Sequence, residues 1–377
     1  MNFTANTERF LGGIRRVMNA VSSKSLNAIL TNILVEARDE TLFLTAYDME
    51  LRIRTALPAT VLQPGAIAVP AKKFADIIGA LPVGDLVFET KLDNPDDIVL
   101  ICHKARYEMH GHNADGFPAP EPFAEDWSLV IGGKELVDCL CKTEFARSED
   151  ESRQALNGVL VSIRGGMRTI AASDGRRLSL VESPLESPAT DGGEASPAPT
   201  KEGEFILPRK TVIELIRSVD QSKTVTIRLT HTTAVFENGD TIMTSRLVDK
   251  TYPNYRSVIP VNFRNSVLVP RALFADVVKR VKTMASDSDG GASILLSIKE
   301  STMTISASSQ EYGNAQDEIA VELHGDPIDI AFNPQYLSDP LKTLSCDKFE
   351  LKYNDGVTPV EMTGDPGFIY ILMPMRS

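Results

Sequence analysis

The chain repeats one arrangement of structural elements three times along its length. Each third contains a short helix-like segment that begins at a proline, at Pro70, Pro208 and Pro334. An amphipathic helix and a strand-like run precede it in each third. The helix lies at 11–20, 136–146 and 273–285. The strand-like run lies at 42–46, 168–172 and 302–306. Equivalent positions are roughly 125–140 residues apart, which is the size of a domain rather than of a solenoid repeat. The sequence therefore predicts three copies of one module.

The periodicity of the apolar residues indicates the class of this module. Phe74, Ile77, Ile78 and Leu81 follow the i, i+3, i+4, i+7 spacing of a helix with one buried face. Segment 225–229 instead alternates apolar with polar residues, as a half-buried strand does. Two helices among roughly eight short strands per repeat predict an α+β domain, in which an antiparallel sheet is covered by helices on one face.

Proline-rich segments mark the expected domain boundaries, near 117–122 and near 252–255. We expect domains at 1–125, 126–257 and 258–377. Segment 183–204 is rich in Pro, Ser, Gly, Ala and Glu and has almost no large apolar residue. It is therefore expected to be a disordered loop inside the middle domain, with a functional tether as the alternative.

Composition places the chain among ordinary globular proteins. Apolar residues make up 42% and charged residues 24% of its 377 residues. No apolar run approaches the roughly 18–20 residues of a membrane span, and the N-terminus lacks the pattern of a secretory signal. The four cysteines have no Cys-x-x-Cys spacing, so they are expected to be reduced thiols of a cytoplasmic protein.

The charge of the chain is unevenly distributed. A net charge of −12 argues against binding to nucleic acid, because phosphates attract Lys and Arg. Four of the expected helices nevertheless sum to +8 (+2, +1, +2 and +3), namely segments 8–20, 71–80, 209–219 and 271–284. The acidic residues therefore lie mostly in strands and loops. Chance placement of exposed lysines is one interpretation, and a basic helical surface inside an acidic shell is the other.

No pattern of a catalytic or metal site stands out. His110 and His112 would share one face of a strand but have no further spaced ligand, and packing or surface roles are the simpler interpretation. The aspartates at 93, 96 and 97 lack the remaining ligands of a calcium loop. Nucleotide-binding and hydrolase motifs are missing from the sequence, so no metal and no cofactor are expected. One enzymatic alternative is a phosphate-binding loop at 173–178, although no nucleophile or base accompanies its two arginines.

Several short motifs, taken in order, resemble one family. They are Pro-Ala-Lys-Lys-Phe from Pro70, Arg-x-x-Leu-Asn-Gly from Arg153, Ser-Asp-Gly-Arg-Arg-Leu from Ser173, Arg-Leu-Val-Asp from Arg246, Tyr-Pro-x-Tyr-Arg from Tyr252 and Met-Pro-Met-Arg from Met373. With them the chain resembles the bacterial DNA polymerase III beta subunit, the sliding clamp, over essentially its whole length. It departs from the family at Gln154 and Ala155, where clamps often carry aromatic residues, and at Ser377.

The resemblance implies a fold, an assembly and a function. It implies a head-to-tail homodimer that closes a ring, with three clamp domains per protomer, sheets outside and two helices per domain facing the lumen. Such a ring is a processivity factor and not an enzyme: it encircles duplex DNA without reading its sequence. The replicative polymerase, the clamp loader and repair proteins are expected to bind through short linear motifs, with no role for a membrane.

The resemblance and the charge pattern together nominate three sets of residues. The expected DNA-binding residues are Arg15, Lys24, Lys72, Lys73, Arg209, Lys210, Arg217, Lys279, Arg280 and Lys282. By resemblance, the partner-peptide groove is lined by Leu156, Ser173, Gly175, Arg176, Arg177, Leu178, Pro253, Val258, Asn333, Tyr336, Val357, Met373, Pro374, Met375 and Arg376. The expected dimer contacts are Tyr107 and Met109 on an edge strand and Val281 and Met284 on the last helical stripe, for which core packing is the alternative.

Overall fold

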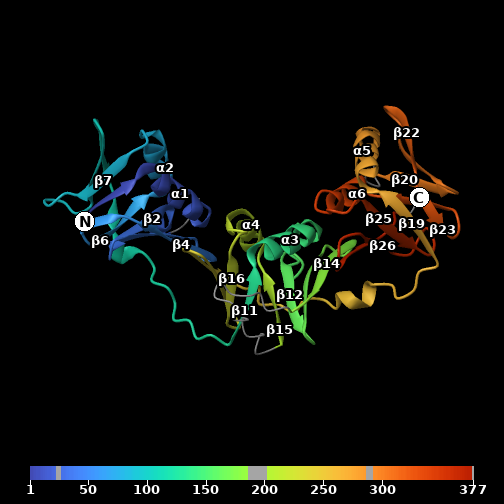
Figure 1. Cartoon of the computed structure of the whole chain (residues 1–377), viewed down its shortest axis with the longest axis horizontal. Coiled ribbons are helices and arrows are strands. Elements are labelled where there is room, and N and C mark those ends of the chain that lie inside the picture. The colour runs from blue at the N-terminus through green and yellow to red at the C-terminus, as the bar shows by residue number, and fades with distance from the viewer. Residues whose placement is uncertain (23–26, 186–201, 286–291, 376–377) are drawn as a thin grey trace. The chain divides into compact units, whose positions relative to one another are not determined.

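A computed structural model describes residues 1–22, 27–185, 202–285 and 292–375 (Figure 1). The chain divides into two compact parts, which we describe separately. The first part comprises Met1–Glu135 and Ile213–Leu247. The second comprises Leu136–Glu186, Glu202–Val212 and Val248–Ser377. The middle third of the chain therefore contributes strands to both parts.

Six α-helices form within the described residues, one in each segment where the sequence predicts one. They are α1 (Thr7–Val17), α2 (Ala71–Ala80), α3 (Gly133–Thr143), α4 (Arg209–Ser218), α5 (Arg271–Val281) and α6 (Pro334–Leu341). Polar caps fix two of the starts, since the Asn6 side chain accepts N–H bonds at the start of α1 and Asn333 does so at α6. Prolines 70, 208 and 270 stand directly before α2, α4 and α5. A 3₁₀ turn extends three of the helices: η1 (Met18–Ala20) follows α1, η4 (Glu144–Ala146) follows α3 and η6 (Lys282–Met284) follows α5.

The first part contains two antiparallel sheets. The nine-stranded sheet has the order β10 (His112–Asn113), β6 (Gly65–Pro70), β2 (Asn32–Arg38), β3 (Thr41–Tyr47), β4 (Leu51–Pro58), β18 (Thr241–Arg246), β17 (Thr233–Asn238), β16 (Thr224–Leu229), β11 (Trp127–Gly132). The five-stranded sheet has the order β5 (Thr60–Gln63), β1 (Asn2–Asn6), β7 (Asp85–Thr90), β8 (Asp97–Cys102), β9 (Ala105–His110). Pairing of Leu51 with Ser245 joins strands of the first and middle thirds into one sheet.

The second part repeats this plan. Its nine-stranded sheet has the order β15 (Gly203–Leu207), β12 (Val159–Arg164), β13 (Met167–Ser173), β14 (Arg177–Pro184), β27 (Phe368–Leu372), β26 (Val360–Thr363), β25 (Lys348–Tyr353), β19 (Asn265–Pro270), β23 (Glu322–His324). The four-stranded sheet has the order β22 (Gly313–Ala320), β21 (Thr302–Ser309), β20 (Ile294–Lys299), β24 (Ile328–Phe332). Here Leu178 pairs with Ile371 and joins the middle third to the last.

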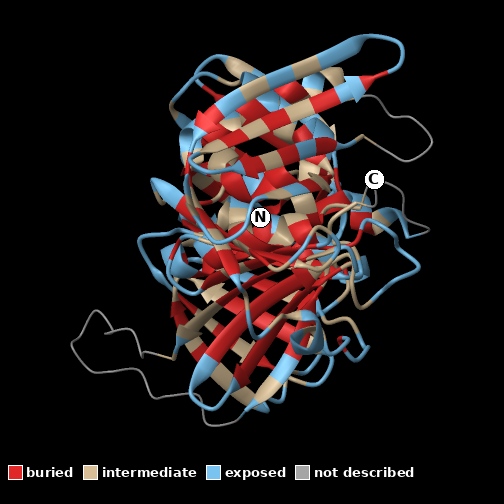
Figure 2. Ribbon diagram, turned by 90° about the vertical axis from the view of Figure 1, so that its right-hand side faces the viewer, coloured by how far each residue is buried: buried red, intermediate tan, exposed pale blue. Residues whose placement is uncertain are grey.

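Apolar side chains lie between the sheets and the helices. In the first part, Phe3 stacks on Phe88 with ring centroids 4.7 Å apart, and Phe10 of α1 meets Phe74 of α2 edge to face at 5.6 Å. Figure 2 shows buried residues following the strands, in alternation with exposed ones on the outer strands. The predicted α+β class with antiparallel sheets is confirmed.

The expected disordered loop at 183–204 begins and ends as strand. Strand β14 continues to Pro184 and β15 starts at Gly203, while residues 186–201 lie outside the described part of the chain. No helix in the described ranges is both long and apolar enough to cross a membrane.

Candidate functional site

Three basic side chains of the first part are exposed on neighbouring helices. Arg15 lies near the end of α1, and Lys72 and Lys73 lie in the first turn of α2, next to α1 (Figure 1). The helices bury the opposite faces, including Phe10 and Phe74, so these cations point away from the core. None of the three forms an ion pair with a described residue, which leaves them available to an external anion.

Two further expected DNA contacts belong to this part. Arg217 of α4 is exposed, and its Nη1 donates to the Asn19 side chain at 3.1 Å. Asn19 in turn donates to the Glu214 carboxylate at 2.6 Å, so a polar chain links α4 to η1. Lys24 lies outside the described residues.

The basic residues of the second part differ in whether their side chains are available to an external anion. Arg209 and Lys279 are exposed. Arg280 pairs with Asp317 at 2.5 Å, and the Lys282 ammonium donates to Gln335 at 2.6 Å. Lys210 is half-buried and takes part in a polar interaction within the chain. Arg280, Lys282 and Lys210 are thus engaged internally, which the charge pattern alone did not indicate.

A tight turn connects β13 to β14 and contains the expected groove motif. Gly175 has φ +87°, a left-handed conformation that favours glycine. The Ser173 hydroxyl donates to the Arg177 carbonyl at 2.8 Å and accepts from the Gly175 N–H at 3.1 Å. The Asp174 carboxylate accepts from the backbone N–H groups of Arg176 and Arg177 at 2.8 and 3.0 Å. The turn is therefore held by its own side chains.

Arg177 differs from the exposed groove residue that we expected. Its guanidinium donates to Asp174 at 3.0 Å, to Asp339 at 2.8 Å and to the Phe145 carbonyl at 2.6 Å. It also stacks over the Tyr336 ring at 4.3 Å, and only 9% of its side chain is exposed.

Burial alone would lower the pKa of the Arg177 guanidinium, but Tyr370, Asp339 and Asp174 raise it above its ordinary value. This side chain ties the turn to α6, and its contact with partner peptides stays a prediction. The same contacts engage one of the two arginines that a phosphate-binding loop would use.

Arg176 and the C-terminal segment lie together beside this turn. Arg176 is exposed and forms no ion pair with a described residue, while its carbonyl accepts from the Met373 N–H at 3.0 Å. Strand β27 ends at Leu372, directly before the Met-Pro-Met segment, where a proline cannot donate to a sheet. One further bridge forms where the Met375 N–H donates to the Ala331 carbonyl at 2.8 Å. Arg376 lies outside the described residues.

The other expected groove residues fall into two groups. Leu178 is almost fully buried in an apolar cluster with Tyr252 and Ile371, and Leu156 packs against this cluster half-buried. Leu178 therefore supports the surface rather than lining it.

The second group is more accessible. Val258 is 52% and Val357 72% exposed. Pro253 borders a small pocket of about 190 Å³ beside Tyr252. Asn333 directly precedes α6 and caps it, and Tyr336 lies in the first turn of the helix, where its ring packs against Arg177.

The expected dimer contacts also divide by burial. Tyr107 is 37% exposed and Met109 half-buried on β9, which is an edge strand as predicted. Met284 is half-buried on η6. Val281 is only 2% exposed and packs in the core of its own domain, so it is corrected from a candidate contact to a core residue. Sequence reasoning missed the long edge strand β22, whose polar residues gave no clear strand pattern.

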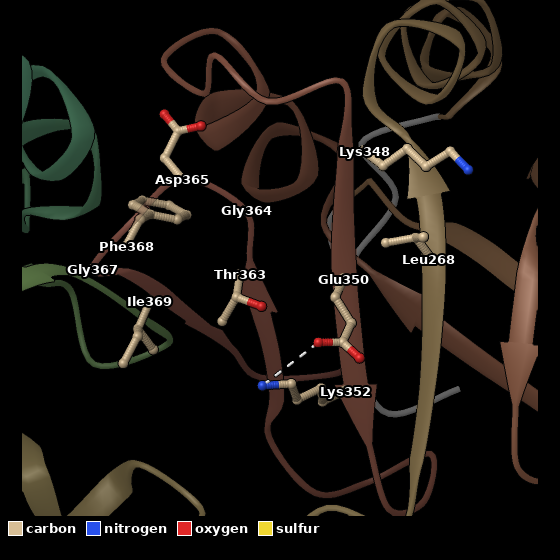
Figure 3. Close-up of a pocket in the computed structure, with 10 residues that line it drawn as sticks. All are labelled: Leu268, Lys348, Glu350, Lys352, Thr363, Gly364, Asp365, Gly367, Phe368 and Ile369. Atoms are coloured by element: carbon tan, nitrogen blue, oxygen red, sulfur yellow. Dashed lines mark ion pairs between the residues drawn. The ribbon is translucent and has the colours of Figure 1, made fainter.

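A shallow depression of about 500 Å³ lies over β25 and the turn between β26 and β27 (Figure 3). Its charges are satisfied within the chain: Lys352 pairs with Glu350 and Glu361, and Lys348 pairs with Glu322. Asp365 accepts from Lys142 at 2.8 Å. Within the described ranges, no three His, Cys, Asp or Glu side chains are placed to hold a metal ion. We assign no ligand to this depression.

Comparison with known proteins gives consistent matches over the whole chain. Three family models match: DNA polymerase III beta subunit, N-terminal domain, at residues 1–121, central domain at 130–254 and C-terminal domain at 256–376. The beta sliding clamp of Synechococcus elongatus is 31% identical over 96% of this chain and 95% of that protein. The beta sliding clamp of Caulobacter vibrioides is 29% identical over 100% of both. The crystal structure of a Pseudomonas aeruginosa DnaN sliding clamp bound to griselimycin is 25% identical, covers 100% of both chains and superposes with a TM-score of 0.92.

Proposed function

Because the chain belongs to the DNA polymerase III beta subunit family, the beta sliding clamps, we propose specific surfaces by which it holds DNA, its second copy and its partners. The function of the family is that of a processivity clamp, which is not catalytic. We propose that two copies close around duplex DNA, with domains at 1–125, 126–257 and 258–377. A closed ring makes the linkage to DNA mechanical, so local contacts to phosphates are free to stay weak enough for sliding.

The observation that carries the DNA surface is the exposure of unpaired cations on the helices of an acidic chain. Arg15, Lys72, Lys73, Arg209 and Lys279 are exposed and form no ion pair with a described residue, and the net charge of the chain is −12. Lys and Arg contact phosphates without reading bases, as sliding requires. Arg217, Lys210, Arg280 and Lys282 take a secondary part, because intramolecular bonds already hold them. Lys24 completes the proposed set.

Charge reversal tests this surface. Changing Arg15, Lys72, Lys73 and Arg209 to Glu should weaken loading onto DNA, and with it the amount of protein retained, while the dimer stays intact. For every phosphate that the variant no longer binds, the slope of log affinity against log salt falls by about one. The matched control changes Arg164, Lys223, Lys250 and Lys299 to Glu, four exposed residues of strands and loops, and shifts net charge equally. Equal loss of retention in both variants would contradict the assignment.

For the dimer we propose pairing of β9 of one copy with β22 of the other. Each is the last strand of its sheet, and such edges present unpaired backbone groups. Segment 311–320 carries Glu311, Asp317 and Glu318 and no basic residue, whereas segment 104–110 carries Lys104 and Arg106 against Glu108. The charges favour the heterologous pair over two like edges. Tyr107, Met109 and Met284 are the proposed apolar contacts.

For partner proteins we propose a groove beside the turn of residues 173–177. Arg176, Met373, Pro374 and Met375 supply its exposed wall, with Val258, Val357 and Pro253 as further apolar surface. Methionine adapts to ligands of different shape, which suits a receptor for several linear motifs. Polymerase, clamp loader and repair proteins then compete for one groove per protomer. A variant with Arg176→Ala should lose peptide binding without any change in dimer mass.

A further inference from the structure

A pocket of about 400 Å³ lies in the first part of the chain, and none of its lining residues belongs to a surface assigned above. It is lined by the proline-rich segment 118–123 and by residues of β3, β4, β17 and β18. Arg52 fixes the segment, since its Nη2 donates to the carbonyls of Pro118 and Ala119 at 2.8 and 3.1 Å. The volume is within the range of sites that bind small ligands or peptide side chains.

The turn beside this pocket repeats the turn beside the proposed groove. The Asp48 carboxylate accepts from the backbone N–H groups two and three residues later, at 3.0 and 2.8 Å. Asp174 does the same at 2.8 and 3.0 Å. In both turns the next residue has a positive φ, 82° at Met49 and 87° at Gly175.

The neighbouring strand repeats as well. The Arg246 N–H donates to the Glu50 carbonyl at 2.9 Å, as the Met373 N–H donates to the Arg176 carbonyl at 3.0 Å. The pocket lies where strands of the first and middle domains join. The proposed groove lies at the equivalent junction of the middle and last domains.

The side chains give this pocket a chemistry of its own. Tyr47, Met49 and Phe123 supply apolar surface, and the Arg52 guanidinium lies 4.3 Å above the Tyr47 ring. No described carboxylate forms an ion pair with Arg52, and burial lowers the pKa of its guanidinium. Arg246 lies at the border, 3.7 Å from Glu121, with both side chains more than half exposed.

Two guanidinium groups therefore border the pocket, and that of Arg52 has no carboxylate partner among the described residues. The two carboxylates that line the pocket, those of Glu50 and Glu121, are on its exposed rim. A ligand that complements this pattern carries an apolar ring and a negative charge side by side.

We propose that this pocket binds a short extended peptide in which an aromatic side chain stands next to a carboxylate. The ring packs on Tyr47, Met49 and Phe123, and the carboxylate pairs with Arg52 and Arg246. The inference goes beyond the proposed function, and only the comparison between the two turns depends on that function. Because Glu50 stands where the groove has Arg176, the two sites should select different peptides.

A pair of capped peptides tests the proposal on the full-length protein. The probes are acetyl-Pro-Phe-Asp-Ala-amide and its uncharged match, acetyl-Pro-Phe-Asn-Ala-amide, titrated by saturation-transfer NMR. The aspartate peptide should bind at about millimolar concentration or tighter, and the asparagine peptide at least about tenfold more weakly. Equal affinity of the two peptides, or no binding of either, would overturn the proposal.

Two exposed variants locate the bound peptide. Arg246→Glu should weaken binding of the aspartate peptide by about tenfold or more, whereas Arg176→Glu should leave it unchanged. Both positions are on the surface, so both variants should fold, and a thermal melt checks this. Loss of binding in Arg176→Glu with none in Arg246→Glu would place the peptide in the groove. That result overturns this inference while leaving the proposed function in place.

Discussion

Two consecutive arginines of the β13–β14 turn have opposite environments, and the difference predicts opposite consequences of mutation. Arg177 neutralises Asp174 and Asp339, which are largely buried with it. Arg177→Ala leaves Asp174 without its ion pair and Asp339 with Lys342 as its remaining cation, and should lower the free energy of unfolding by about 3–5 kcal/mol. Arg176→Ala is the matched control and should change it by less than about 0.5 kcal/mol. Urea unfolding of both variants measures this, and equal stability of the two would refute the assigned roles.

The sequence alone could not distinguish these two arginines. The Asp-Gly turn is a local signal, and the positive φ of Gly175 follows from it. Besides the nearby Asp174, the partners of Arg177 are Phe145 and Asp339, 32 and 162 residues away in the chain. Only tertiary pairing decides which side chain is buried, so the sequence predicts the turn but not the ion pairs.

The buried pair of Lys142 and Asp365 predicts a pH dependence. Burial opposes ionisation of Asp365, yet hydrogen bonds from Lys142 and Ser345 hold its pKa at about 2, below the ordinary 3.8. The unfolded state therefore binds the proton more readily than the folded state. The stabilisation is complete above about pH 5 and is lost as pH falls through 3.8 towards 2, by about 2 kcal/mol.

The variant Asp365→Asn should remove this pH dependence between about pH 5 and 2 and destabilise the protein at neutral pH. Denaturant midpoints across this range measure it. An unchanged slope of stability against pH in the variant would show that another group is responsible.

Among the elements, the C-terminal segment should be needed for peptide binding but not for formation of the dimer. Deleting residues 373–377 removes roughly 100 Å² of apolar surface from the proposed groove. At about 25 cal/mol per Å² this weakens peptide binding by about 50–100-fold. Strand β27 ends at Leu372, so the sheet and the dimer should persist. Peptide titration and dimer mass on one truncated protein test this, and loss of the dimer with peptide affinity kept would refute it.

The stability of the dimer should depend on the sign of a charge introduced on the edge strand β9. Tyr107→Asp should weaken the dimer, because the proposed partner strand β22 carries Asp317 and Glu318. Tyr107→Lys removes the same ring but should weaken the dimer much less. Sedimentation at micromolar concentration compares them, and equal effects of both substitutions would contradict the pairing of β9 with β22.

The elements differ in how far the sequence predicts them. Helices were predictable because a proline or an Asn cap marks the start and an apolar stripe continues it, as at Pro70 and Asn333. Strand β22 was not, because seven of its eight residues face solvent at least in part and show no buried alternation. It is a strand because it pairs with β21, and the local sequence of β22 does not reveal that pairing.

At the scale of the whole molecule, the threefold repeat was visible in the sequence because each copy keeps a domain-sized spacing. The charge pattern indicated basic helices but not which cations are free, since Arg280 and Lys282 are engaged by Asp317 and Gln335. The pocket bordered by Arg52 was not predictable, because its walls come from segments on both sides of a domain junction.

The proposed function requires that the protein is linked to DNA by encircling it. Retention on DNA after loading with a bacterial clamp loader tests this most directly, with one plasmid in nicked circular form and in linear form. The protein should stay on the circle through gel filtration at moderate salt and slide off the linear molecule. Cutting the loaded circle once should then release it. Equal retention on both forms, or continued binding after the cut, would contradict a topological linkage.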